Sequence, residues 1–406
     1  MKLFKSLLFA MPVLFLALSC SDDFVEPDLD NDGIADEIDL CPNTPAGEAV
    51  TVNGCPINSP IYLDDNGVTI KSFEWGEAGQ TGEINGEVYT IVDETMLREM
   101  ISKGEDVTRV CTTKVVDMSE LFYLITFNED ISSWDVSNVT NMKKMFGGDF
   151  MGDFNKSFNQ DISFWDTSSV TNMSGMFSNS RFNQPIANWE VRNVSDMSDM
   201  FSHSSFNQPV GDWDVSSVTN VSGMFSKSSF NQPIGNWDVS SVTNMSNMFD
   251  GLFAFGTVFL NPFNQDISSW DVGNVTNMAG MFSASGFNQP IGNWDVGNVT
   301  NMAGMFSASG FNQPIGNWDV SSVIDMSNMF IGLRFGLVGF PNPFNQDISS
   351  WNVSSVLDMS EMFKESEINQ DLSPWNVNNV TICAEFSENT PQWTLPKPNF
   401  ANCNPN

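Results

Sequence analysis

Apolar residues recur along most of the chain in a fixed order, and their period changes within each repeat. In residues 230–249, FNQPIGNWDVSSVTNMSNMF, Phe230 and Ile234 keep the period of two that is typical of extended chain. After the tryptophan, Val, Met, Met and Phe are spaced by three, three and one residues. At about 100° per residue they cover an arc of roughly 120° on a helix. The pattern predicts a short strand and a two-turn helix in every copy.

Ten tryptophans mark ten copies of this phrase. Most steps between them are 24 residues, and the three longer ones are 31, 33 and 33 residues. The tryptophans are Trp134, Trp165, Trp189, Trp213, Trp237, Trp270, Trp294, Trp318, Trp351 and Trp375. Neither a two-turn helix nor one short strand is stable alone in water, so each copy must bury its apolar residues against the next copy. The sequence therefore predicts an α/β repeat solenoid over residues 111–383.

Other patterns flank the repeats and predict a cap at each end. Asn85-Gly86 lies between alternating residues, which is a hairpin signal, and Asp93 and Gly104 bound a helical pattern. Residues 58–110 are thus a small α+β capping domain. Residues 384–406 are the C-terminal cap.

A disulfide between Cys383 and Cys403 is expected to fasten the C-terminal cap. Cys383 takes a core position that methionine fills in most copies, and the tail after it is long enough to fold back over the last coil. Cys111 lies at the opposite end of the stack, too far away to bridge either of these cysteines.

The N-terminus reads as an export signal over residues 1–19, because two lysines precede an apolar stretch too short to span a bilayer. The ending LALSC resembles a bacterial lipobox, which implies that Cys20 is lipidated; the alternative is an ordinary signal peptide. Residues 20–27 are then a lipidated acidic tether. Their SDDFVE is similar to sequences that direct lipoproteins to the outer face of the outer membrane. We expect a lipid-anchored protein facing the cell exterior, with the lipid as its only membrane anchor.

Residues 28–39, DLDNDGIADEID, have the oxygen-ligand spacing of an EF-hand-type loop, with glycine at position 6. One structural calcium ion suits this set, because it offsets carboxylates that would otherwise repel one another. The expected ligands are Asp28, Asp30, Asp32, Asp36, Asp39 and the carbonyl oxygen of Ile34. The alternative is an acidic, solvated linker. The continuation makes residues 28–57 resemble a thrombospondin type 3 repeat, which implies a disulfide between Cys41 and Cys55.

Charge and composition exclude several classes of function. The 406 residues include 50 acidic and 16 basic side chains, a formal charge of −34, which disfavours contact with nucleic-acid phosphates. His203 is the only histidine, and it falls at a variable turn. The carboxylates recur in rows instead of forming one constellation with unlike environments. We therefore expect no enzymatic activity.

The phrase WDVSSVTNMSNMF resembles the repeat of the BspA-like leucine-rich-repeat surface proteins, including the related repeats of mycoplasma lipoproteins. The resemblance covers roughly residues 111–383. It implies a right-handed, leucine-rich-repeat-like solenoid on a surface protein that takes part in adhesion and protein binding. Related chains are expected to carry a cysteine near Ser72 that pairs with the one at Cys111, and this chain lacks it.

Two functions are consistent with these features. The favoured one is a monomeric adhesin or protein-interaction scaffold that uses the extended repeat face. The alternative is a carbohydrate-binding lipoprotein whose exposed aromatic residues stack on sugar rings. The tryptophans recur in register with Ile and Val, which indicates that they are buried. Buried tryptophans favour the scaffold over the carbohydrate-binding protein.

The extended copies are the expected partner-binding region, for an extracellular protein or glycan. Their insertions contain phenylalanines for which the repeat reserves no core position. These are Phe253, Phe255, Phe259, Phe335 and Phe340. The alternative is that the insertions fold onto the solenoid edge and widen its core.

Overall fold

A computed structural model describes residues 59–148, 157–254, 257–335 and 338–406, together with 28–31, 33–39 and the single residues 41, 44, 50 and 54. The chain divides into two compact units, residues 1–57 and 58–406. The side chains of Ala254, Phe335 and Val338 lie outside the description. None of the described helices has the length and apolar character needed to cross a membrane.

The second unit begins with two small sheets and a helix. Strands β1 (Ile61–Leu63) and β2 (Ile70–Ser72) pair antiparallel. Strands β3 (Thr81–Ile84) and β4 (Glu87–Ile91) form the expected hairpin at Asn85-Gly86, and β5 (Val110–Cys111) runs parallel to β4.

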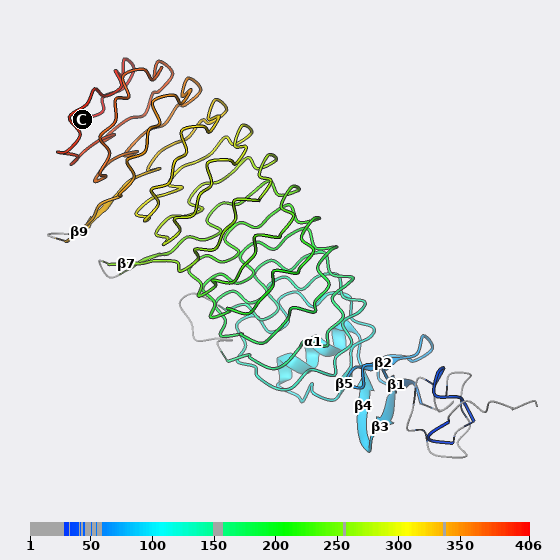
Figure 1. The fold of residues 1–406 in the computed structure, drawn as a ribbon. Helices are drawn as coiled ribbons and strands as arrows, with labels where there is room; N and C mark the ends of the chain where they lie inside the picture. The colour runs from blue at the N-terminus through cyan, green and yellow to red at the C-terminus, as the bar shows by residue number, and fades with distance from the viewer. Residues whose placement is uncertain are drawn as a thin grey trace, which may run out of the picture. The chain divides into compact units, whose positions relative to one another are not determined.

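Helix α1 (Glu94–Lys103) lies between β4 and β5 in the sequence and covers the first coil. The carboxylate of Asp93 accepts a hydrogen bond from the Met96 N–H at 2.8 Å and caps the helix, as the sequence predicts. Leu97 is buried in the same core as Trp134, and the Trp134 Nε1–H donates to the Val107 carbonyl at 3.0 Å. These contacts join the helical cap to the repeats (Figure 1).

The repeats stack coil on coil, and single parallel bridges link neighbouring coils at equivalent residues, such as Asn244 with Asn277 and Asn277 with Asn301. The expected α/β class is wrong, however, because α1 is the only α-helix in the described part of the chain. The coils consist of turns and extended segments, as the trace in Figure 1 shows. A strand and a helix in each copy do not occur.

The segment expected to be helical is a turn whose third residue is left-handed. Asn247 has φ 56°, a conformation that interrupts a right-handed helix and is typical of a type II turn. The N–H groups of Met245, Asn247 and Phe249 donate to carbonyls of the next coil at 2.8–2.9 Å instead of to their own segment. Turns of this kind direct Val, Met and Phe inward, which reproduces the apolar spacing of a helix.

The repeat tryptophans are buried in the interior of the coils. From Trp165 onward each indole N–H donates to a carbonyl of the preceding coil; Trp237 Nε1, for example, donates to Val210 at 3.0 Å. Phe225 and Phe249 of successive coils stack with ring centroids 5.9 Å apart. Each copy is therefore buried by its neighbours, as the sequence predicts.

Asparagines form a hydrogen-bonded ladder along the stack. The side-chain oxygen of Asn183 accepts from the backbone N–H of Asn207 at 2.9 Å, and that of Asn207 accepts from Asn231 at 2.9 Å. The same bond recurs from coil to coil until the oxygen of Asn369 accepts from Thr394 in the C-terminal segment at 2.9 Å. The ladder is structural, as expected for a row of identical polar side chains.

Two of the extended copies project as β-hairpins, which we name arm 1 and arm 2. Arm 1 comprises β6 (Leu252–Ala254) and β7 (Thr257–Phe259), and arm 2 comprises β8 (Leu333–Phe335) and β9 (Val338–Phe340). Both pairs are antiparallel, with Leu252 opposite Phe259 and Leu333 opposite Phe340. Figure 1 shows both arms leaving the same side of the coils.

Candidate functional site

Arm 1 presents an exposed apolar surface. Phe253 is 41% exposed, Phe259 52% and the adjoining Leu260 54%. The repeat core buries its own phenylalanines almost completely, so these side chains differ from the rest of the array. Exposed apolar side chains gathered on a projecting element are typical of an interaction surface.

A buried asparagine fixes the base of each arm. The side-chain amide of Asn261 donates to the Phe225 carbonyl at 2.8 Å, and that of Asn342 donates to the Phe306 carbonyl at 2.6 Å. Both asparagines are fully enclosed. In unextended copies a serine stands at this position, such as Ser228 before Phe230. The arms are thus attached to the coils by buried polar contacts of their own.

A glycine at the start of each arm allows the chain to pass close to the next coil. A Cβ atom on Gly251 would lie 2.1 Å from the Ala284 carbonyl oxygen, and one on Gly332 would lie 2.0 Å from that of Glu365. Unextended copies have a left-handed residue at the same position, such as Ala284 with φ 47°. The exchange to glycine therefore accompanies the insertion of an arm.

The predicted partner-binding phenylalanines are only partly placed. Phe253 and Phe259 are exposed on arm 1, and Phe340 of arm 2 is half-buried. Phe255 and the side chain of Phe335 lie outside the described residues. Sequence reasoning missed Leu260, although it directly follows the apolar Val-Phe pair of β7.

The acidic loop near the N-terminus is described except for Asp32. One oxygen of Asp28 accepts from the Gly33 N–H at 3.0 Å, while its Oδ1 is buried without a hydrogen-bond partner. Asp36 accepts from the Leu29 N–H at 2.8 Å. Among the residues placed here, no group of three or more acidic, cysteine or histidine side chains forms a metal cluster. Asp30, Ile34 and Asp39 are also present in this loop.

The cysteines occupy different environments. Cys383 and Cys403 are joined in a disulfide. Cys41 is also disulfide-bonded, while Cys55 and the candidate lipidation site Cys20 lie outside the described residues. Cys111 is a buried thiol that packs in the small cluster with Ile61, Ile70 and Ile91.

Ser72 and Cys111 are neighbours, and burial raises the pKa of the Cys111 thiol, while its contact with the Thr113 hydroxyl opposes this effect. The position expected to carry a partner cysteine in related chains therefore lies beside Cys111.

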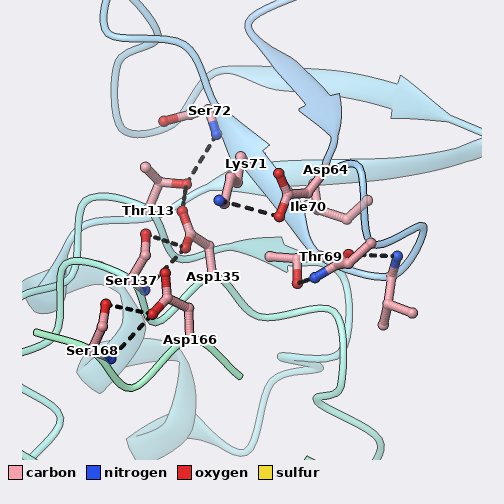
Figure 2. A network of polar contacts seen from close by, with 12 residues as sticks. Asp64, Thr69, Ile70, Lys71, Ser72, Thr113, Asp135, Ser137, Asp166 and Ser168 are labelled. Atoms are coloured by element: carbon pink, nitrogen blue, oxygen red, sulfur yellow. Dashed lines mark hydrogen bonds and ion pairs between the residues drawn. The ribbon is translucent and has the colours of Figure 1, made fainter. Parts of the chain in front are cut away.

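The carboxylate rows stabilise turns. Figure 2 shows Asp135 accepting hydrogen bonds from Thr113 Oγ1 at 2.6 Å and from Ser137 Oγ at 2.7 Å. Asp214 accepts in the same way from Ser216, and these hydrogen bonds lower the pKa of Asp214. Such an aspartate bonds the backbone two residues later, as in an Asx turn.

His203 is uncharged at neutral pH. Burial of its imidazole, with a smaller contribution from the nearby Lys227 ammonium, lowers its pKa to about 4. Its Nδ1 lies 3.0 Å from Ser202 Oγ. Lys227 forms an ion pair with Asp250 at 3.3 Å. The histidine belongs to the packing at the edge of the coils.

A family model described as "Mycoplasma protein of unknown function, DUF285" matches residues 94–205, 149–261, 257–335 and 340–401. These ranges cover more than half of the chain and include the coils, arm 1 and strand β8 of arm 2. Among characterised proteins, an alpha-agarase from Thalassotalea agarivorans is 63% identical over 30 residues. That match spans 7% of this chain and 2% of the agarase.

Proposed function

Because the chain belongs to the DUF285 family of Mycoplasma proteins of unknown function, whose description assigns no activity, we propose a function from its own surface. The protein is a surface-anchored adhesin or protein-interaction scaffold of the BspA-like type. The coils hold arm 1 and arm 2 at a fixed separation, and the arms contact an extracellular partner. The observation that carries this proposal is the exposure of Phe253, Phe259 and Leu260 on an arm that is firmly anchored at its base.

The burial of the repeat tryptophans supports a scaffold over a carbohydrate-binding protein in which these tryptophans stack on sugar rings. Stacking on sugar rings requires exposed aromatic faces, and the ten repeat tryptophans are at most 4% exposed. Their indole N–H groups are already bonded to carbonyls, as in Trp213 to Ile186 at 3.1 Å. The rows of tryptophan therefore contribute to the core and present no face on which a sugar ring could stack.

Shortening both arms is expected to weaken partner binding at least about tenfold, the effect of losing one or two apolar anchors. Residues 250–262 and 331–343 are each replaced by SKSS, the four residues at 226–229 of an unextended copy. Binding is measured on immobilised extracellular matrix proteins to which the wild-type protein has been found to bind. Phe164→Ser, which removes an exposed phenylalanine away from the arms, is the control. Undiminished binding by a folded, doubly shortened protein would show that the arms are not the site.

The proposed anchor is a lipid on Cys20, which would place the protein on the outer membrane facing the cell exterior. In bacteria that export the chain, labelled palmitate should enter the wild type and not Cys20→Ser. The difference is expected to be complete, because no other cysteine follows the apolar leader directly. Equal labelling of both proteins would remove this part of the proposal.

The proposed tether binds one calcium ion in residues 28–39. A buried carboxylate oxygen without a hydrogen-bond donor, such as Oδ1 of Asp28, is suited to a cation. Asp30, Asp32, Asp36, Asp39 and the Ile34 carbonyl are the other ligands that the loop pattern assigns.

Calorimetry on the chain lacking residues 1–20 should give about one calcium per molecule, with Kd in the range of roughly 10⁻⁴–10⁻³ M. Asp28→Asn combined with Asp36→Asn should abolish the signal, while Asp214→Asn in the coils should leave it unchanged. The hypothesis fails if the wild type produces no calcium-dependent heat.

A further inference from the structure

A polar pocket of about 640 Å³ opens beside arm 2. Its lining comes from three segments: Arg334 and Pro341 at arm 2, residues 365–367 of the next coil, and the C-terminal residues Ser387, 389–392 and Lys397. The volume lies within the range of small-molecule sites, about 300–1,000 Å³. Arm 2 leaves the coils near the C-terminus (Figure 1).

The fold does not require the polar lining, because the chain builds the same arrangement once more without it. The block that contains arm 1 precedes the block that contains arm 2 by 81 residues, counted from Trp237 to Trp318. Small or apolar residues occupy the equivalent lining positions beside arm 1. The equivalent pairs are Phe253 and Arg334, Ala284 and Glu365, Gly286 and Glu367, and Ala308 and Asn389. Of the two blocks, only that of arm 2 carries charged groups on the arm and the adjacent coil, at Arg334, Glu365 and Glu367, so a role other than folding is indicated for these three.

Hydrogen bonds hold several lining side chains in place. The Asn389 amide donates to Glu365 Oε1 at 2.7 Å. The Lys397 ammonium donates to Ser387 Oγ at 2.9 Å and lies 4.9 Å from the centroid of the Trp393 ring. Side chains that are already ordered lose little conformational entropy when a ligand binds.

The chemistry of the lining indicates a neutral ligand rich in hydroxyl groups. Arg334 and Lys397 balance Glu365 and Glu367, and the long-range field of a chain with formal charge −34 repels anions. Guanidinium, ammonium and amide groups donate hydrogen bonds, whereas the carboxylates and hydroxyls accept them. A sugar hydroxyl does both at once, and the rings of Pro341 and Pro391 offer apolar surface to sugar C–H groups.

We propose that this pocket binds a short neutral oligosaccharide, held by Arg334, Glu365, Asn389, Gln392 and Lys397. The site is separate from the apolar surface of arm 1 and does not depend on the scaffold function proposed above. A protein that contacts a partner through its arms and a saccharide through this pocket would recognise two components of one surface.

The test uses the chain from residue 21 onward and neutral hexasaccharides of glucose, mannose, xylose, galactose and N-acetylglucosamine. Hexagalacturonate and inorganic phosphate serve as anionic probes. Saturation-transfer NMR detects binding, and calorimetry gives Kd. The combined variant Arg334→Phe, Glu365→Ala and Asn389→Ala places the arm 1 residues at three lining positions, and Phe164→Ser, away from both arms, is the control. Arg334→Ala alone is the milder variant if the combined one does not fold.

At least one neutral hexasaccharide should bind the wild type and the Phe164→Ser control equally. The combined variant should bind it at least about tenfold more weakly, because charge-assisted hydrogen bonds are lost. Three results would overturn the proposal: no neutral hexasaccharide binds, an anionic probe binds more tightly than all of them, or the pocket variants leave Kd unchanged. Undiminished partner binding by the doubly shortened protein, together with saccharide binding by the wild type, would count against the scaffold function alone.

Discussion

Trp270→Ala is expected to lower the free energy of unfolding by about 4 kcal/mol, within the range for removing a buried aromatic side chain. The indole is 4% exposed and lies between Trp237 and Trp294, with ring centroids 6.5 and 6.4 Å away. Its Nε1–H donates to the Ile234 carbonyl at 3.1 Å. The substitution leaves a cavity and removes one of the two hydrogen bonds of the Ile234 carbonyl, which still accepts from the Trp237 N–H at 3.1 Å.

The position of Trp270 within the stack adds a second effect. Because the coils of a solenoid contact only their neighbours, a weakened interface in the middle uncouples the two halves. Urea unfolding followed by circular dichroism should therefore show a broader or two-step transition. The control is Thr276→Ala in the same coil, whose exposed hydroxyl donates to the Thr243 carbonyl at 3.2 Å. A Trp270→Ala protein as stable as this control would contradict the stacked core.

Gly251→Ala is expected to cost about 3 kcal/mol, the upper range for inserting a methyl group into a packed site. The new Cβ would lie 2.1 Å from the Ala284 carbonyl oxygen and 2.5 Å from that of Phe259. Both are backbone atoms, so relief requires arm 1 to move away from the coil. Hydrogen exchange of the arm 1 amides should rise together with the loss of stability.

Gly310→Ala is the matched control for Gly251→Ala. A Cβ atom there meets no atom within 4 Å, so the change should alter stability by no more than about 0.5 kcal/mol. Equal effects of the two substitutions in urea unfolding would show that the close approach at Gly251 does not restrain the arm.

The stacking and its core could be predicted from the sequence, because burial depends on which residues recur and not on the exact backbone. The prediction of a helix in each copy was wrong because the spacing of apolar residues does not indicate the sign of φ. The third turn residue is left-handed even where it is Glu120, Lys144 or Glu361, and these residues give no turn signal. Glycine or asparagine at the same position, as in Gly223 and Asn247, was the available indication.

The arms were predictable as insertions but not as hairpins. A strand of three residues, such as Leu252–Ala254, is too short for its alternation to be recognised. The anchoring role of Asn261 depends on a carbonyl 36 residues earlier in the chain, at Phe225. The pocket beside arm 2 is likewise lined by residues from three separate segments, so no local sequence motif indicates it.

The asparagine ladder makes the array modular. The same hydrogen bond joins each pair of adjacent coils, as from Asn288 to Asn264 and from Asn312 to Asn288, both at 2.9 Å. Removing or adding one 24-residue copy would therefore leave no donor or acceptor of the ladder without a partner. Arm 1 and arm 2 are three copies apart, on the order of 15 Å at about 4.8 Å per coil. The distance between the arms can therefore change only in whole increments of one coil. The number of copies between the arms thus determines how far apart two contact sites on one partner must lie for both arms to bind it.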